Sequence, residues 1–241
     1  MKISVIVPAF NEEKLIAVSL RSVQASLVAF ARRGWETELI VCDNNSTDRT
    51  AELARAAGAT VVFEPVNQIG RARNRGAEVA TGDWLIFIDA DSYPSPELFG
   101  DVAETIQTGR CLAGGCLVRL DGGNFPARLA ARGWNMVSRI TRWAAGSFIF
   151  CAAATFWQVG GFNLELFVTE ELDLSRRFKR LARETGKKMV ILRRHQLTTS
   201  ARKVQLYSAA EILFFAAKVC FRPRRTLKNR AACQPWYDGR R

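Results

Sequence analysis

The sequence predicts an α/β protein with a mostly parallel sheet flanked by helices. Three observations support this. Short apolar runs rich in β-branched residues recur along the first ninety residues, and segments with helical periodicity separate them. Such alternation is typical of right-handed crossovers between parallel strands. The run 84–88 is apolar throughout, as expected for a strand that is buried on both faces.

Four strands and three helices are predicted for the N-terminal half. The strands are expected at 2–9, 37–42, 60–63 and 84–88, and the helices follow the first three strands. Asn11 is expected to cap the first helix, which Gly34 ends. One of Ser46, Thr47 and Asp48 is expected to cap the second helix, over 49–57.

The C-terminal half alternates in the same way. Ser95 and Pro96 are expected to begin a helix that ends near Gly109. Further predicted elements are a strand at 113–120, a basic helix at 127–142, a buried strand with a turn within 143–157, a helix at 169–181 and a short strand at 189–192. The apolar run 143–157 is too short to span a bilayer.

Polar and charged groups follow several of the predicted strands. They are Asn11 and Glu12, Asp43, the arginine-rich segment around Arg71, and the pair Asp89 and Asp91. The carboxyl ends of parallel strands meet at one edge of a sheet, where α/β proteins bind ligands. Singly, each group fits a turn or a helix cap. Together they fit a nucleoside diphosphate held with a divalent cation.

Several classes of protein and site are excluded by what the sequence lacks. No glycine-rich turn follows the first strand, which argues against a dinucleotide-binding oxidoreductase and against a nucleotidyltransferase. The six cysteines form no Cys-x-x-Cys pair and no zinc-binding pattern. No secretory signal is visible at the start. We therefore expect reduced thiols and a cytoplasmic protein.

Five segments, at 5–13, 39–48, 70–83, 87–91 and 159–174, also occur in an order that is typical of one enzyme family. The sequence resembles the family 2 glycosyltransferases of the GT-A fold over roughly residues 1–200. The resemblance implies a GT-A domain at 1–200, with a nucleotide-binding half at 1–110 and an acceptor-binding half at 111–200. It also implies a UDP- or GDP-sugar as the donor.

The resemblance assigns roles to the residues of the donor site. Pro8, Phe10 and Glu12 would line the base and the ribose, and Asp43 would hydrogen-bond the base. Asn45 and Arg71 are further candidates for donor binding, and Arg202 is a candidate for contact with the phosphates.

A divalent cation, Mg²⁺ or Mn²⁺, is also implied. Asp91 would hold it against the diphosphate, and Asp89 would meet the ribose or the metal. His195 is a candidate third ligand, because some GT-A enzymes place a late histidine on the metal. The alternative for this only histidine is a surface or packed position.

The general base of the family aligns with Glu171, where the family usually has aspartate. This departure leaves Glu170, Glu171 and Asp173 as candidates, although acids in the first turn also simply favour the helix dipole. The implied reaction is inverting transfer to a hydroxyl of a lipid-linked or cell-envelope glycan acceptor. The alternative is a non-catalytic sugar-nucleotide-binding or membrane-associated scaffold.

The last part of the chain, 201–241, is predicted to be a basic amphipathic extension. Residues 174–241 hold 19 of the 35 Lys and Arg residues and three acids. The apolar segment 204–221 precedes a cluster of arginines, so we expect 204–230 to lie on the inner, anionic face of the cytoplasmic membrane. The alternative is packing on its own domain or on a partner subunit of a homo-oligomer. Nucleic-acid binding is not expected, because the aromatic residues are not interleaved with the arginines.

Overall fold

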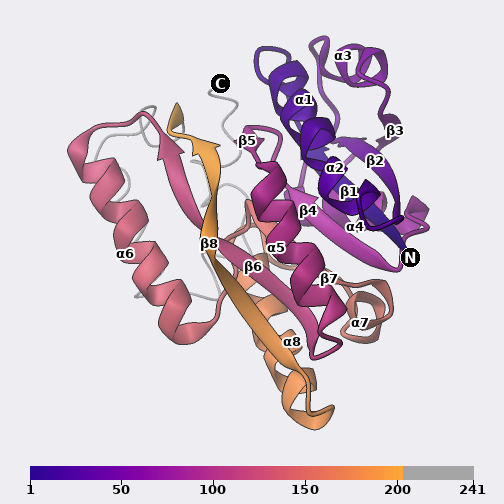
Figure 1. Cartoon of the computed structure of the whole chain (residues 1–241). Helices are drawn as coiled ribbons and strands as arrows, with labels where there is room; N and C mark the ends of the chain where they lie inside the picture. The colour runs from indigo at the N-terminus through magenta and orange to yellow at the C-terminus, as the bar shows by residue number, and fades with distance from the viewer. Residues whose placement is uncertain (203–241) are drawn as a thin grey trace.

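The computed structural model describes residues 1–202. One eight-stranded sheet runs through this part of the chain in the order β3-β2-β1-β4-β7-β6-β8-β5 (Figure 1). Strands β1 to β4 pair in parallel, and β7 joins them antiparallel to β4. Strands β6 and β8 are parallel to each other. The predicted α/β fold with a mostly parallel sheet flanked by helices is confirmed.

The bounds of the elements follow the predicted pattern closely in the first half. The strands are β1 (Lys2–Ala9), β2 (Glu36–Asp43), β3 (Thr60–Phe63), β4 (Trp84–Ile88), β5 (Ser92–Tyr93), β6 (Cys111–Asp121), β7 (Phe148–Ala152) and β8 (Lys188–Ser200). The helices are α1 (Ile16–Ser26), α2 (Val28–Ala31), α3 (Thr50–Ala56), α4 (Ile69–Val79), α5 (Pro96–Gln107), α6 (Phe125–Thr141), α7 (Ala153–Gln158) and α8 (Glu170–Glu184).

Helices cover both faces of the sheet and create two apolar cores. Because side chains alternate along a strand, Val5 faces one core and Ile6 the other. The first core is closed by α1, α2 and α5, and the second by α4, α7 and α8. The strand β4 is buried along its whole length, as the apolar run predicts. It thereby carries Asp89 from the middle of the sheet to its edge.

The prediction that Asn11 caps the first helix is wrong. Asn11 has a left-handed backbone with φ of 51°, and its side chain accepts a hydrogen bond from the Thr47 backbone at 2.8 Å. Helix α1 begins at Ile16, and no side chain caps it. The amide of Asn11 therefore joins the loops that follow β1 and β2, and both loops belong to the edge where ligands are expected.

The end of the described chain also differs from the prediction. The expected strand at 189–192 continues to Ser200, because β6 pairs with β8 as far as Asp121 and Ser200. The two-residue strand β5 then adds to the polar end of β8. Residues 193–200 are mostly polar and do not continue the apolar run of 189–192, so the sequence does not predict this extension. Within 143–157, the predicted strand is present as β7, and the short helix α7 begins directly after it.

No helix within residues 1–202 is long and apolar enough to cross a membrane. The predicted amphipathic segment 204–230 lies outside the described residues.

Candidate active site

The pair Asp89 and Asp91 lies at the carboxyl end of β4, where the prediction places it. The backbone N–H of Ser92 donates to the Asp89 carbonyl at 3.1 Å, which closes a tight turn around the pair. The N–H of Ser200 donates to the Asp91 carbonyl at 3.0 Å, so the end of β8 lies against this turn. Asp91 is 5% exposed. Strand β4 and the end of β8 together fix both carboxylates.

A single buried arginine of α4 connects Asp89 with the start of α8. Arg73 donates from Nη2 to Asp89 at 2.9 Å and from Nη1 to Glu170 at 2.8 Å. Its Nη2 also donates to the Gly146 carbonyl at 2.8 Å, and its guanidinium lies 5.1 Å from the centre of the Phe162 ring. The forked guanidinium thus holds together two acids that are separated by about eighty residues in the sequence.

The two glutamates that begin α8 face this arginine. Glu170 is 3% exposed, and burial together with the charge of Glu171 raises the pKa of Glu170 to about 8, although Arg73 opposes the shift. Burial also raises the pKa of Glu171, again against the effect of Arg73. The backbone of Gly146 runs beside both groups, since a Cβ added there would lie 3.5 Å from Glu171 and 3.4 Å from Arg73, in ordinary contact. The two acids therefore hold protons more tightly than free carboxyl groups do.

Asp173, the third candidate for the base, is held by different partners. Its carboxylate accepts from Arg177 Nε at 2.8 Å, and Arg177 also donates to the Gly161 carbonyl at 2.7 Å. Both residues line a separate open groove beside Asn74 and Asn163. The contacts of Asp173 join α8 to the loop before it and not to Arg73.

On the other side of the Asp89–Asp91 turn, Arg202 reaches the end of β1. Its Nη2 lies 2.7 Å from each carboxylate oxygen of Glu12 and 3.9 Å from Asp91. Glu12 is 4% exposed. The Nε of Arg202 is buried and has no hydrogen-bond partner among the described residues. One cation therefore lies between two acids that were predicted for the donor site, with a donor group still available.

The remaining predicted donor residues lie around the ends of β1 and β2. Asp43 is 7% exposed and accepts from the Ser46 backbone at 3.0 Å. Asn45 has a left-handed backbone with φ of 66° and is exposed. Pro8 is the next-to-last residue of β1, and Phe10 directly follows that strand. These residues share one edge of the sheet with Glu12, as predicted.

Arg71 lies near the ends of β2 and β3, because the backbone N–H of its partner Glu64 donates to the Asp43 carbonyl at 2.9 Å. Arg71 is partly exposed and pairs with Glu64 at 3.0 Å. Arg73, which the sequence did not single out, is the arginine of α4 that contacts the candidate acids. The spacing of small residues could have indicated that Arg73 is buried. Gly70 and Ala77 lie three and four residues from Arg73 and therefore share its side of the helix.

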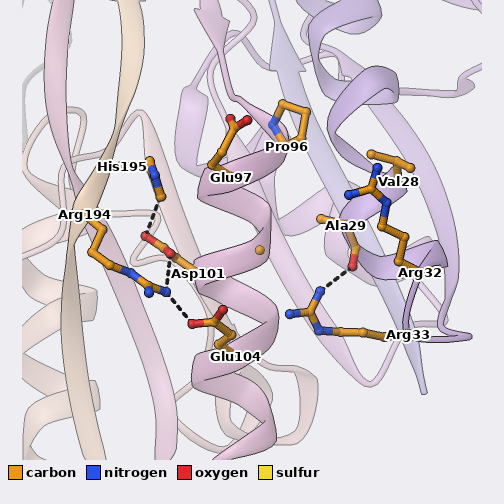
Figure 2. Close-up of a pocket in the computed structure, with 11 residues that line it drawn as sticks. Val28, Ala29, Arg32, Arg33, Pro96, Glu97, Asp101, Glu104, Arg194 and His195 are labelled. Atoms are coloured by element: carbon orange, nitrogen blue, oxygen red, sulfur yellow. Dashed lines mark hydrogen bonds and ion pairs between the residues drawn. The ribbon is translucent and has the colours of Figure 1, made fainter.

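His195 points toward Asp101 of α5 (Figure 2). Its Nδ1 lies 3.1 Å from Asp101 of α5, and Arg194 contacts the same carboxylate at 2.6 Å. These residues line a cavity of about 290 Å³ that Arg32 and Arg33 border on its far side. His195 lies four positions, on the order of 13 Å, before Thr199 along β8, and Thr199 pairs with Ser92. Its role as a metal ligand stays a prediction that this arrangement does not support.

The acids at the sheet edge fit a hard divalent cation. Mg²⁺ is commonly bound through one or two carboxylates together with phosphate oxygens of the substrate, and Asp89 and Asp91 offer such a set. The Arg202 guanidinium, whose Nη2 lies 3.9 Å from Asp91, is suited to a phosphate oxygen. Residues 1–202 contain no group of three or more His, Cys, Asp or Glu side chains that could hold a metal without a substrate. The fit is therefore to a cation that shares its ligands with a phosphate group.

Known glycosyltransferases are similar to this chain in sequence. The chain is 30% identical over 152 residues to a dolichol-phosphate mannosyltransferase of Pyrococcus furiosus, which covers 58% of this chain and 41% of that protein. It is 33% identical over 113 residues to the poly(ribitol-phosphate) beta-N-acetylglucosaminyltransferase TarS of Staphylococcus aureus, covering 44% of this chain and 19% of TarS. The chain spans less than half the length of these curated relatives.

Solved structures share the fold. The crystal structure of S. aureus TarS 1–349 has a TM-score of 0.65 at 21% identity, covering 99% of this chain and 78% of that one. Glucosyl-3-phosphoglycerate synthase from Mycobacterium tuberculosis, in complex with Mn²⁺, UDP and phosphoglyceric acid, has a TM-score of 0.60 at 22% identity, with coverages of 98% and 78%. The family model described as Glycosyl transferase family 2 matches residues 4–160, which is well over half of the sequence. The chain belongs to glycosyl transferase family 2.

Proposed function

We propose that this chain transfers a sugar from a nucleoside-diphosphate sugar to an acceptor hydroxyl, with inversion at the anomeric carbon. The observation that carries the proposal is the position of Arg73, which joins Asp89 at the donor edge to Glu170, the neighbour of Glu171. One guanidinium therefore fixes the spacing between the groups that would bind the donor and the group that would activate the acceptor. A non-catalytic binding protein would not need that spacing.

The donor would bind across the ends of β1, β2 and β4. In this proposal Pro8, Phe10 and Glu12 line the base and ribose, Asp43 hydrogen-bonds the base, and Asn45 and Arg71 lie at the margin. Solved relatives bound to UDP and to UDP-GlcNAc support a UDP-sugar as the donor. GDP-sugars stay in the test panel.

Asp91, with Asp89 beside it, would hold Mg²⁺ or Mn²⁺. The cation supplies positive charge next to the departing diphosphate. The guanidinium of Arg202 would turn from Glu12 toward the phosphates, since its Nη2 lies only 3.9 Å from Asp91. A relative bound to both Mn²⁺ and UDP supports the choice of metal.

Glu171 is our choice for the general base. It is only partly buried, whereas Glu170 is enclosed and bound to Arg73, and Asp173 is bound to Arg177. A raised pKa improves a carboxylate as a base near neutral pH. In this mechanism Glu171 takes the proton of the acceptor hydroxyl as its oxygen attacks the sugar. Glu170 and Arg73 position that carboxylate.

The names of the curated relatives suggest the class of acceptor. One acts on dolichol phosphate and another on poly(ribitol-phosphate). We infer an acceptor that carries phosphate and is attached to a lipid or to the cell envelope. A peripheral position on the inner face of the cytoplasmic membrane, in part through 204–230, belongs to the same proposal.

Release of nucleoside diphosphate tests the proposed function. The full chain would be incubated with UDP-glucose, UDP-GlcNAc and GDP-mannose, Mn²⁺ and a panel of acceptors. Glu171→Gln should lower the rate of release by about 10²- to 10⁴-fold while UDP still raises the melting temperature. The matched control is Glu184→Gln, at the exposed end of the same helix.

The same assay separates the alternatives. Full activity in Glu171→Gln would exclude this residue as the base. Binding of donors without release, across the whole acceptor panel, would favour the non-catalytic binding protein. Asp91→Asn should remove the dependence of release on Mn²⁺, and unchanged dependence would contradict the metal assignment.

A further inference from the structure

Helix α6 presents apolar side chains to the solvent. The most exposed are Phe125 at 69%, Leu129 at 56%, Met136 at 62% and Ile140 at 76%. With 3.6 residues per turn, these four side chains fall within about 60° of one another around the helix axis. They therefore form one continuous stripe, called here the α6 stripe. Most surface helices turn such a stripe toward the core.

The orientation of α6 is fixed by contacts on its other side. The side-chain amide of Asn135 donates to the Val118 carbonyl at 2.8 Å and accepts from the Val118 N–H at 3.0 Å. Ala127 and Ser138 are buried, and Trp134 packs against the first core. Because this polar and small-residue side is held against β6, the α6 stripe cannot turn inward without breaking those bonds. Figure 1 places α6 at one flank of the molecule.

Positive charge borders the α6 stripe. Arg128, Arg132 and Arg139 are exposed along one side of it, and α6 contains no acidic residue. At the C-terminal end of the helix, Lys179 donates to the Thr141 carbonyl at 2.7 Å and Arg176 lies over the Trp143 ring at 5.1 Å. An exposed apolar stripe beside arginines is the composition of helices that lie in a lipid interface.

We propose that the α6 stripe docks on an anionic lipid surface. Charge selects this occupant. A second copy of the chain would bring the same arginines against these. Anionic headgroups match the arginines while Phe125, Leu129, Met136 and Ile140 enter the boundary with the acyl chains.

This docking would bring the candidate active site to the membrane. Strand β6 ends at Asp121 beside Ser200, and the N–H of Ser200 donates to the Asp91 carbonyl at 3.0 Å. Helix α6 starts four residues after Asp121. The α6 stripe is thus linked to the sheet edge that holds Asp91 through the end of β6 and the short loop that follows it. The inference rests on α6 alone and is independent of the proposed sugar transfer.

Vesicle co-sedimentation of the full chain tests the proposal. We expect binding to vesicles of phosphatidylcholine with phosphatidylglycerol, and much weaker binding to phosphatidylcholine alone. Ile140→Asp should lower the partition coefficient by about tenfold or more, because an apolar side chain leaves the interface. Arg132→Glu should lower it by about fivefold or more at low salt. The matched control is Val18→Asp, an exposed valine of α1, which should bind like the wild type.

Three results would overturn the proposal. The first is equal vesicle binding by Ile140→Asp and the wild type. If neutralising Arg222, Arg224 and Arg225 also abolished binding, the membrane contact would belong to those arginines and not to the α6 stripe. A dimer that Ile140→Asp converts to a monomer, with vesicle binding kept, would assign the α6 stripe to a second copy. A melting temperature that falls by many degrees in Ile140→Asp but not in Val18→Asp would show that the chain itself covers the stripe.

Discussion

Two arginine clusters on opposite faces of the same sheet combine similar groups in different surroundings. On the α4 and α8 face, the Arg73 side chain is 2% exposed and bridges Asp89 and Glu170. On the α5 face, the Arg194 side chain is 63% exposed and bridges Asp101 and Glu104 (Figure 2). Each guanidinium binds two carboxylates, but only the Arg73 guanidinium is itself shielded from water.

The difference determines what each cluster can do. Around Arg73, three carboxylates share one buried cation, so burial and mutual repulsion raise the pKa values of Glu170 and Glu171. Around Arg194, water screens the guanidinium and Glu104, whereas Asp101 is buried, and exposed ion pairs such as Arg194–Glu104 contribute little to stability. Burial thus shifts the proton affinity of the acids around Arg73 away from that of free carboxyl groups. The same burial costs free energy, because the charged groups lose their hydration. The variants that follow test this contrast in order of expected effect.

Removal of the buried cation should have the largest effect. Arg73→Met leaves Asp89 and Glu170 without their cation in a closed site, and should lower the free energy of unfolding by about 3–5 kcal/mol. Urea denaturation would measure it. The matched control is Arg75→Met on the same helix, whose exposed pair with Glu78 should contribute nothing measurable. Equal losses in the two variants would contradict the contrast.

The raised pKa of Glu170 should appear in the pH dependence of stability. Between about pH 4.5 and pH 8 the unfolded chain loses the Glu170 proton while the folded chain keeps it. The unfolded state then binds fewer protons, so this group lowers stability as pH rises through that window and adds no further loss above it. Glu170→Gln, which resembles the neutral acid, should remove this contribution.

Urea unfolding of both proteins at several values between pH 5 and pH 8 would provide the comparison. The stability of Glu170→Gln relative to the wild type should increase with pH. Parallel curves would mean that Glu170 is already ionised in the folded protein, bound to Arg73. In that case Glu171 would be the acid of the pair that holds the proton.

Much of the fold, and part of the site, follows from local sequence. The buried run 84–88 predicts β4 and places Asp89 and Asp91 correctly, and Ser95 with Pro96 predicts the start of α5, where Ser95 accepts from the Leu98 N–H. These features depend on neighbours in the chain. Periodicity and capping chemistry are sufficient to find them.

Features that depend on long-range packing were missed or wrong. Three arginines alternate along α4, and only the docking of that helix decides that Arg73 faces inward while Arg71 and Arg75 do not. The interpretation of Asn11 as a cap failed because its amide bonds Thr47 across two loops. The periodicity of apolar residues normally indicates the buried side of a helix. It does not do so for α4, because an arginine occupies a buried position where an apolar residue would be expected.

The smallest effect is expected at the exposed cluster. Arg194→Met removes the contacts with Asp101 and Glu104, but Asp101 keeps His195 at 3.1 Å and Glu104 remains hydrated. The melting temperature at neutral pH should therefore fall by about 2–4 °C at most, because Asp101 is buried but still paired, and nucleoside diphosphate release should be unchanged. Differential scanning calorimetry at low and high salt would measure the melting temperature. A clear loss of stability, or a loss of release, would mean that this second cluster also works as a unit, and that exposure alone does not separate the two faces.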